Sequence, residues 1–450
     1  MTSRLLLLAL ACATALTSSC NKKKSDPGIT VTHETEAERS ESMKSAFSDS
    51  PQEGAKILDP SRPEHAEVDA FFTKLGIAAR KGDMVAYQEC LSVDAMVRHL
   101  EAKELISFRD DKQRAAFIKG AEGSMGKSAG NLSFDRHVIS RLEETAPNQL
   151  LAYTRQYDNE FQTVTKMRWW LVKEDKAWRA YDFEELSQGV RASTMMGAVA
   201  GNLKGKIAPW MAPMTAMATA MQDLHSGDLV EKLTTVQKHA EEILKHSPPQ
   251  EVEIVARQMV VTGLIMNGES EKVLEEIDAL EKLPNPSPGI YFQKGLALAG
   301  LERFAEARTA YQTYADLLGW DSDAHEMMAD AYYAEDKKAE ALDHALKGLA
   351  DNKESEGCLA TASVSSGPEK VGELAPYFDA MPDPEVAYET AIDHALELED
   401  EAVAKALLEM LKAKSPKSDL IEIYEEIFAE EAAGDDEEEE MEENAGEDRD

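Results

Sequence analysis

Two carboxylate–histidine pairs have the residue types that general acid–base catalysis uses. Asp135 and His137 stand two residues apart in a stretch of alternating polar and apolar residues, and Asp94 and His99 lie in a stretch with helical periodicity. The alternation fits a solvated strand face equally well, with Asp135 and His137 pointing outward and doing no chemistry. A base is assigned only where its reach to a proton can be shown. We therefore predict no catalytic residues and a chain that is not an enzyme.

Four methionines, Met211, Met214, Met217 and Met221, recur every three or four residues, which places their thioethers on one side of a helix. Three interpretations fit this run. The side chains pack in a core, where methionine fills irregular gaps, or they form a stripe for an apolar partner helix. Alternatively they bind Cu(I), which prefers thioether ligands. Core packing is favoured because apolar residues at helical spacing usually face a core, and we predict no metal and no cofactor.

The remaining sequence gives no other chemical signature. The cysteines, at positions 12, 20, 90 and 358, match no disulfide framework and no metal-ligand spacing. We predict that Cys90 and Cys358 are buried free thiols, since cysteine often serves as a small core residue. Motifs for phosphate binding, zinc, a nucleophile elbow or a nucleotide fold are missing.

The N-terminus has the pattern of an export signal. A basic residue precedes the apolar run Leu5–Leu16, which is too short to cross a bilayer. Thr17-Ser18-Ser19-Cys20 follows, and small residues before a cysteine resemble the lipobox of bacterial lipoproteins. Thr17 stands where that family favours leucine. The resemblance implies cleavage before Cys20 and diacylglycerol on its thiol.

These features predict a signal peptide over 1–19 and a location in the cell envelope, as a periplasmic or surface lipoprotein anchored through Cys20. The alternative is ordinary secretion, with cleavage after Ala13 or Ala15. Residues 20–63 are polar, charged and short of aromatics, so we predict a disordered linker there.

Composition gives a strongly acidic chain with enough apolar residues for real cores. It has 450 residues, 43% of them hydrophobic, and a net charge of −37. The segment Gly434–Asp450 holds eleven acidic residues and one arginine, and we predict a disordered acidic tail over 432–450. The rest of the chain is still acidic, which disfavours binding to nucleic acid or anionic lipid and favours a basic partner.

Residues 64–190 predict an α+β domain. Helical periodicity marks 64–80, 83–100 and 112–122, and alternation then predicts four strands within 132–186. This order of elements, with the last strand Trp178–Asp182, resembles the nuclear transport factor-like (cystatin-like) cones. The resemblance implies an apolar pocket between sheet and helices, and some relatives are enzymes.

A 34-residue period follows the connector 191–227. The recurring slots of three successive units are occupied by Val261, Leu264, Val273 and Ile277, by Gly295, Leu298, Ala307 and Tyr311, and by Ala329, Tyr332, Ala341 and Ala345. Small residues and an aromatic in fixed slots at this period resemble tetratricopeptide repeats. We predict repeats at 256–289, 290–323 and 324–357 within a helical array over 228–431. The expected fold is therefore multidomain, an α+β cone-like domain followed by an all-α tetratricopeptide-type solenoid.

The resemblance implies partner binding on the concave face, which the first helix of each repeat lines. The residues expected there are Tyr291, Gln293, Lys294, His325, Glu326 and Asp330. We predict an exported, lipid-anchored bacterial scaffold or adaptor that binds a protein or peptide, basic in character. The alternatives are a small-ligand-binding or enzymatic cone domain that the repeats localise, and a metal-handling protein that uses the Met-rich connector.

Overall fold

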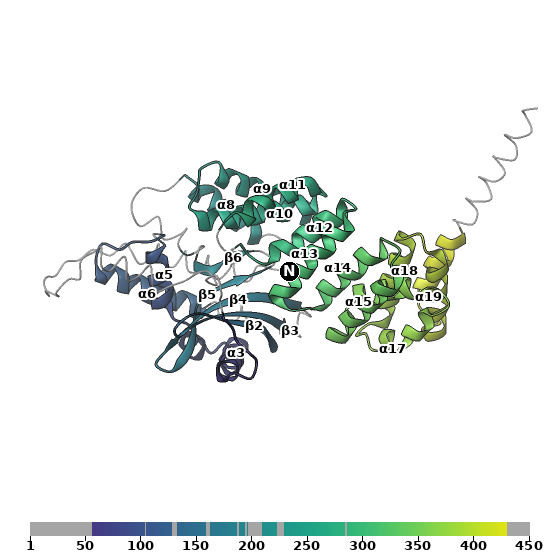
Figure 1. The fold of residues 1–450 in the computed structure, drawn as a ribbon, viewed down its shortest axis with the longest axis horizontal. Helices are drawn as coiled ribbons and strands as arrows, with labels where there is room; N and C mark the ends of the chain where they lie inside the picture. Colours follow the sequence, from purple (N-terminus) through teal and green to yellow (C-terminus); the bar gives the residue numbers. More distant parts are fainter. Residues whose placement is uncertain are drawn as a thin grey trace, which may run out of the picture. The chain divides into compact units, whose positions relative to one another are not determined.

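The computed structural model describes residues 56–103, 105–127, 133–158, 163–186, 189–193, 196, 209–222, 229–283 and 286–429 (Figure 1). The predicted signal, most of the predicted linker and the acidic tail lie outside the described residues. The chain divides into two compact units, residues 1–301 with 316–319 and residues 302–315 with 320–450.

The first unit begins with helices and an antiparallel sheet. The helices are α3 (Pro63–Lys81), α4 (Met84–Glu89), α5 (Val93–Ala102) and α6 (Asp111–Lys127). The strands are β1 (Lys56–Ile57), β2 (Arg136–Ala146), β3 (Gln149–Asp158), β4 (Thr163–Glu174), β5 (Ala177–Glu185) and β6 (Val190–Arg191), and they lie side by side in chain order. The four long strands confirm the predicted meander. Asn148 and Asp175 turn it with positive φ angles of 63° and 50°, which Asn and Asp tolerate better than most residues.

The edges of this α+β body differ from the prediction. Lys56 and Ile57 pair with β2, and Leu58 is 3% exposed in the core. The linker predicted over 20–63 is therefore wrong at its C-terminal end, because a single apolar residue, Leu58, anchors a short edge strand that composition does not reveal.

The single helix predicted over 83–100 is also wrong, because the structure has two helices there, α4 and α5. The chain leaves helical geometry at Cys90–Ser92, where Cys90 and Ser92 exchange backbone hydrogen bonds with Ala180 of β5. Ser92 then caps α5 by accepting from the Ala95 N–H at 3.3 Å. A tertiary contact thus outweighs the helical propensity of the segment.

Aromatic side chains fill the space between the helices and the sheet. Phe72 of α3, Trp169 of β4 and Phe183 of β5 are each fully buried, with ring centroids 5.6 Å apart for Phe72–Trp169 and 5.1 Å for Trp169–Phe183. The interior of this α+β body is a packed core at these positions.

The first unit continues into helices that pack in neighbouring pairs. They are α8 (Met211–Gln222), α9 (Leu229–Leu244), α10 (Gln250–Met266), α11 (Ser270–Glu281) and α12 (Gly289–Gly300). Met214, Met217 and Met221 are at most 4% exposed and share a core with α9 and α10. The core-packing interpretation of the methionine run is confirmed, and α8 belongs to the helical array, which therefore begins before residue 228.

The loop after β5 joins the sheet to this helical part. Ser287 donates from its hydroxyl to the Leu186 carbonyl at 3.4 Å, and a side chain at Gly289 would overlap the same carbonyl. Gly189, with φ at +60°, lies against Gln258 of α10. Sheet and helices therefore form one body in the first unit.

The second unit has its own core. It holds most of α13 (Phe304–Leu318), then α14 (Ser322–Tyr333), α15 (Lys338–Asp351), α16 (Glu356–Ser366), η4 (Val371–Leu374), α17 (Ala375–Phe378), α18 (Pro384–Glu397), α19 (Glu401–Lys414) and a helix over 420–429. Helix α16 runs to Ser366 and is buried along most of its length. Its small residues let α14, α15 and α18 pack around it.

The predicted period appears in the helix boundaries. Helices α11, α13 and α15 begin at Ser270, Phe304 and Lys338, which are 34 residues apart in each step. The slot residues are buried, with Tyr332 as the partly exposed exception. The structure thus has the helix pairs of a helical repeat protein.

Candidate functional site

The residues predicted for the concave face on α12 contact neighbouring helices. Gln293 is 8% exposed and accepts a hydrogen bond from the side-chain amide of Gln258. The Lys294 ammonium lies 2.9 Å from the Glu281 carboxylate, and Tyr291 packs against the core of α8–α12. Of the three predicted residues on this helix, Gln293 is therefore too buried to contact a partner directly.

Two of the three predicted residues of α14, Glu326 and Asp330, lie against α16. Thr361 donates to the Asp330 carboxylate at 2.7 Å, and Glu326 lies where a side chain at Gly357 would stand. Burial raises the pKa of the Asp330 carboxyl, because desolvation disfavours the charged form. Glu326 is half-buried.

His325 forms a cluster that the sequence did not predict. It is 8% exposed, and its Nδ1 lies 3.1 Å from Nδ1 of His344 on α15. Trp320 stacks on the His325 ring with centroids 4.6 Å apart, and Tyr332 lies 5.5 Å from the His344 ring. One imidazole must donate its N–H and the other accept, so at most one Nδ1 carries a proton at this distance.

Both histidines prefer the neutral form. Burial lowers the pKa of His325, and burial with the neighbouring His325 lowers the pKa of His344 to about 4. The pair is therefore neutral around pH 7. The missed signal was the spacing, since residues 19 apart face each other across a helix pair of this length.

Acid should weaken the fold through this pair. The pKa of His344 is lower in the folded chain than its ordinary value of 6.5, so the unfolded chain binds more protons between these two pH values. Stability then falls as pH drops below 6.5, by about 1 kcal/mol between pH 7 and pH 5.5 for this one group. Urea unfolding at both pH values should show a loss that is larger in the wild type than in His344→Gln by about this amount. His246→Gln, at an exposed position in the turn after α9, should keep the wild-type loss; equal pH dependence in all three chains would contradict the assignment.

Neither predicted carboxylate–histidine pair forms. His137 faces α3, where Nε2 lies 2.9 Å from the Asp69 carboxylate, and Asp135 instead pairs with Arg80 at 3.6 Å. The outward orientation expected for His137 is wrong, because its ring packs 5.5 Å from the buried Phe72 of α3 and 6.0 Å from the buried Phe134.

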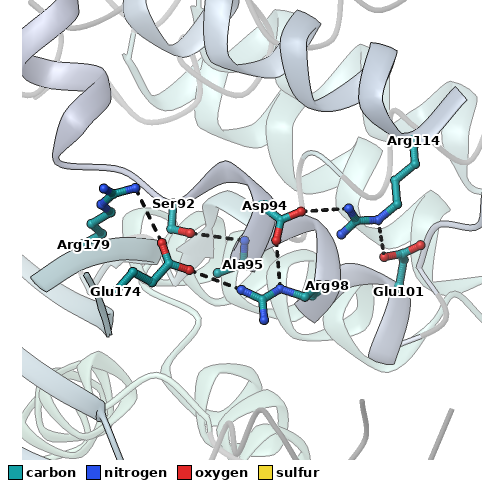
Figure 2. Close-up of polar contacts among 8 residues, drawn as sticks. All are labelled: Ser92, Asp94, Ala95, Arg98, Glu101, Arg114, Glu174 and Arg179. Atoms are coloured by element: carbon teal, nitrogen blue, oxygen red, sulfur yellow. Dashed lines mark hydrogen bonds and ion pairs between the residues drawn. The ribbon is translucent and has the colours of Figure 1, made fainter. Parts of the chain in front are cut away.

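The second pair is separated by ion pairs (Figure 2). Asp94 lies 3.0 Å from Arg98 and 2.7 Å from Arg114, in a chain of charges that continues to Glu174. His99 is 2% exposed, and Arg191 donates to its Nε2 at 3.3 Å. A crevice of about 290 Å³ nearby is lined by residues that include Leu91 and Arg179 but neither Asp94 nor His99.

The other sheet face carries a buried charge network that the sequence analysis missed. Asp182 is fully buried and accepts from Arg191, from the Ser193 hydroxyl and from the Ser193 N–H at 2.9 Å. The Arg191 guanidinium lies 3.9 Å above the Trp170 ring, and Arg168 lies 4.8 Å from the same ring. This network links β5, β6 and Ser193.

The other predicted features stand as follows. Cys90 and Cys358 are buried free thiols, as expected, and burial raises the pKa of each. Cys20 lies outside the described residues. Within the described ranges, no helix has the length and apolar content to cross a membrane, and no group of three or more His, Cys, Asp or Glu side chains is placed to hold a metal ion.

Comparisons with protein-family models, curated proteins and solved structures return no match for this chain.

Proposed function

We propose that this chain is an exported, lipid-anchored scaffold of the cell envelope that binds a protein or peptide partner through tetratricopeptide-type repeats. The observation that carries the proposal is the run of helix pairs whose second helices begin 34 residues apart. Stacked pairs of this kind form extended concave surfaces that suit a peptide or protein. The lipobox resemblance at Cys20 supplies the anchor.

The alternatives have less support. In the α+β body, Phe72, Trp169 and Phe183 occupy the space where a small ligand of a cone domain would lie. The thioethers of Met214 and Met217 are packed in a core, which is a poor setting for ion capture. A scaffold role depends on the repeats and needs neither a ligand pocket in the α+β body nor a metal site in α8.

A partner capture experiment tests the scaffold role. The full chain and a chain that ends at Ala433 are used to capture proteins from solubilised envelopes. Because the chain is acidic without its tail, both should retain the same basic partner, and its association should slow as salt rises. An on-rate indifferent to salt, or binding that disappears with the tail, would contradict a site in the repeats.

Lipid attachment is tested separately. Cys20→Ser removes the thiol that would accept diacylglycerol, so the variant should accumulate unprocessed or appear in the soluble fraction. Fractionation and mass spectrometry of the N-terminus measure both outcomes. A processed variant that stays with the membranes would exclude lipidation at Cys20. The proposal that the repeats bind a partner would not be affected by that result.

A further inference from the structure

We propose that His325 and His344 form a two-nitrogen site for a divalent transition-metal ion of the Zn²⁺ class, on the helix pair α14–α15. The proposal starts from the facing Nδ1 atoms, which lie 3.1 Å apart and come from two different helices. Zn²⁺ lies about 2.0–2.1 Å from histidine nitrogen, so two ligands at a tetrahedral angle are about 3.3 Å apart. The distance between the two nitrogens therefore needs to grow by only a few tenths of an ångström, and both rings turn so that their lone pairs meet at the ion.

The surroundings hold the two rings in place. Trp320 covers one face of His325, with the two ring planes 18° apart, and its centroid is 5.3 Å from the His344 ring. Tyr332 lies on the other side of His344, 5.5 Å away. A preorganised pair loses little side-chain freedom on binding, which favours affinity.

Charges of both signs lie near the pair. Asp321, Asp343 and Asp351 act on the His325 ring as negative charges, against the single positive charge of Lys347. Asp343 and Lys347 also pair with each other at 2.7 Å. At both rings Lys347 acts more strongly than any one of these carboxylates, so the proposal rests on the geometry of the pair.

The protonation states suit metal binding as well. A metal ligand must be a neutral imidazole, and the lowered pKa of both rings keeps them neutral at pH 7. Binding requires the donor ring to move its proton from Nδ1 to Nε2, so both Nδ1 lone pairs face the ion and no net proton is released. His344 is only partly buried, and water completes the coordination.

The test is a Zn²⁺ titration of the full, tag-free chain by calorimetry, with excess Mg²⁺ present to occupy the carboxylates of the tail. The wild type should bind one Zn²⁺ whose affinity falls about tenfold or more in His344→Gln, because half of the protein ligands are lost. His246→Gln removes a histidine from the turn after α9 and should bind like the wild type. The melting temperature should rise with Zn²⁺ in the wild type and in His246→Gln.

A second measurement covers the case in which His344→Gln disturbs the fold. Histidine ring nitrogens observed by NMR in the wild type should report Zn²⁺ on Nδ1 of exactly two rings, with their Nε2 atoms protonated. Zn²⁺ that leaves these two rings unchanged would overturn the proposal. Equal affinity and stoichiometry in the wild type and a folded His344→Gln would overturn it as well.

Discussion

Replacing Asp182 by alanine should lower the free energy of unfolding of the α+β body by about 3–5 kcal/mol, the range for removing one partner of a buried ion pair. The Asp182 carboxylate is fully buried and accepts from Ser193, from the Phe183 N–H at 3.0 Å and from Arg191. Without it, the Arg191 guanidinium stays beside Trp170 with its charge uncompensated. Several donors lose their acceptor at the same time, and each costs its desolvation energy.

The measurement is urea unfolding followed by tryptophan fluorescence. Three of the five tryptophans, Trp169, Trp170 and Trp178, lie in this sheet, so the signal reports mainly on the affected body. Asp94→Ala is the matched control, since Asp94 is 51% exposed although it also contacts two arginines (Figure 2). It should cost less than about 1 kcal/mol, as exposed ion pairs do. Equal losses in the two variants would show that the Asp182 network does not hold the sheet.

Replacing Ala341 by leucine should destabilise the second unit by about 1–3 kcal/mol, the usual cost of overpacking a core. Ala341 is fully buried in α15, and this helix packs against both α14 and α16. A larger side chain must therefore push one of two neighbours away. The substitution tests the assignment of Ala341 to the small-residue slot of the repeat.

Ala339→Leu is the control for this prediction. Ala339 lies two residues earlier in the same helix and is exposed, so the extra atoms meet solvent and the helix propensity changes little. Thermal unfolding followed by circular dichroism should separate the two variants. A melting temperature for Ala341→Leu as high as that of Ala339→Leu would place the small-residue slot elsewhere in the helix.

The acid sensitivity of the His325–His344 pair and the proposed metal site share the same two rings but have different readouts. Protons and Zn²⁺ compete for Nδ1, so the affinity for Zn²⁺ should fall as pH drops through the range in which the rings charge. Changes in unfolding energy with pH need no metal. The Zn²⁺ titration therefore tests metal binding by the two rings, and urea unfolding without metal tests their contribution to stability.

Local patterns in the sequence determined the elements of this protein. The alternation in 132–186 gave strands β2–β5, and the small residues at a 34-residue period gave the helix pairs around α11, α13 and α15. The methionine spacing gave one buried side of α8. Each of these predictions uses the side-chain periodicity within one strand or helix. That periodicity determines which side of the element faces a core, and it does not depend on which residues the core contains.

Tertiary structure alone decided which side chains meet. His325 and His344 are 19 residues apart and come together only because α14 and α15 pack as a pair. His137 contacts Asp69 because α3 packs on β2. Asp182 is buried with its arginine because a short edge strand, β6, folds back onto β5. These contacts depend on the register and packing between elements, and the spacing within any one element carries no information about them.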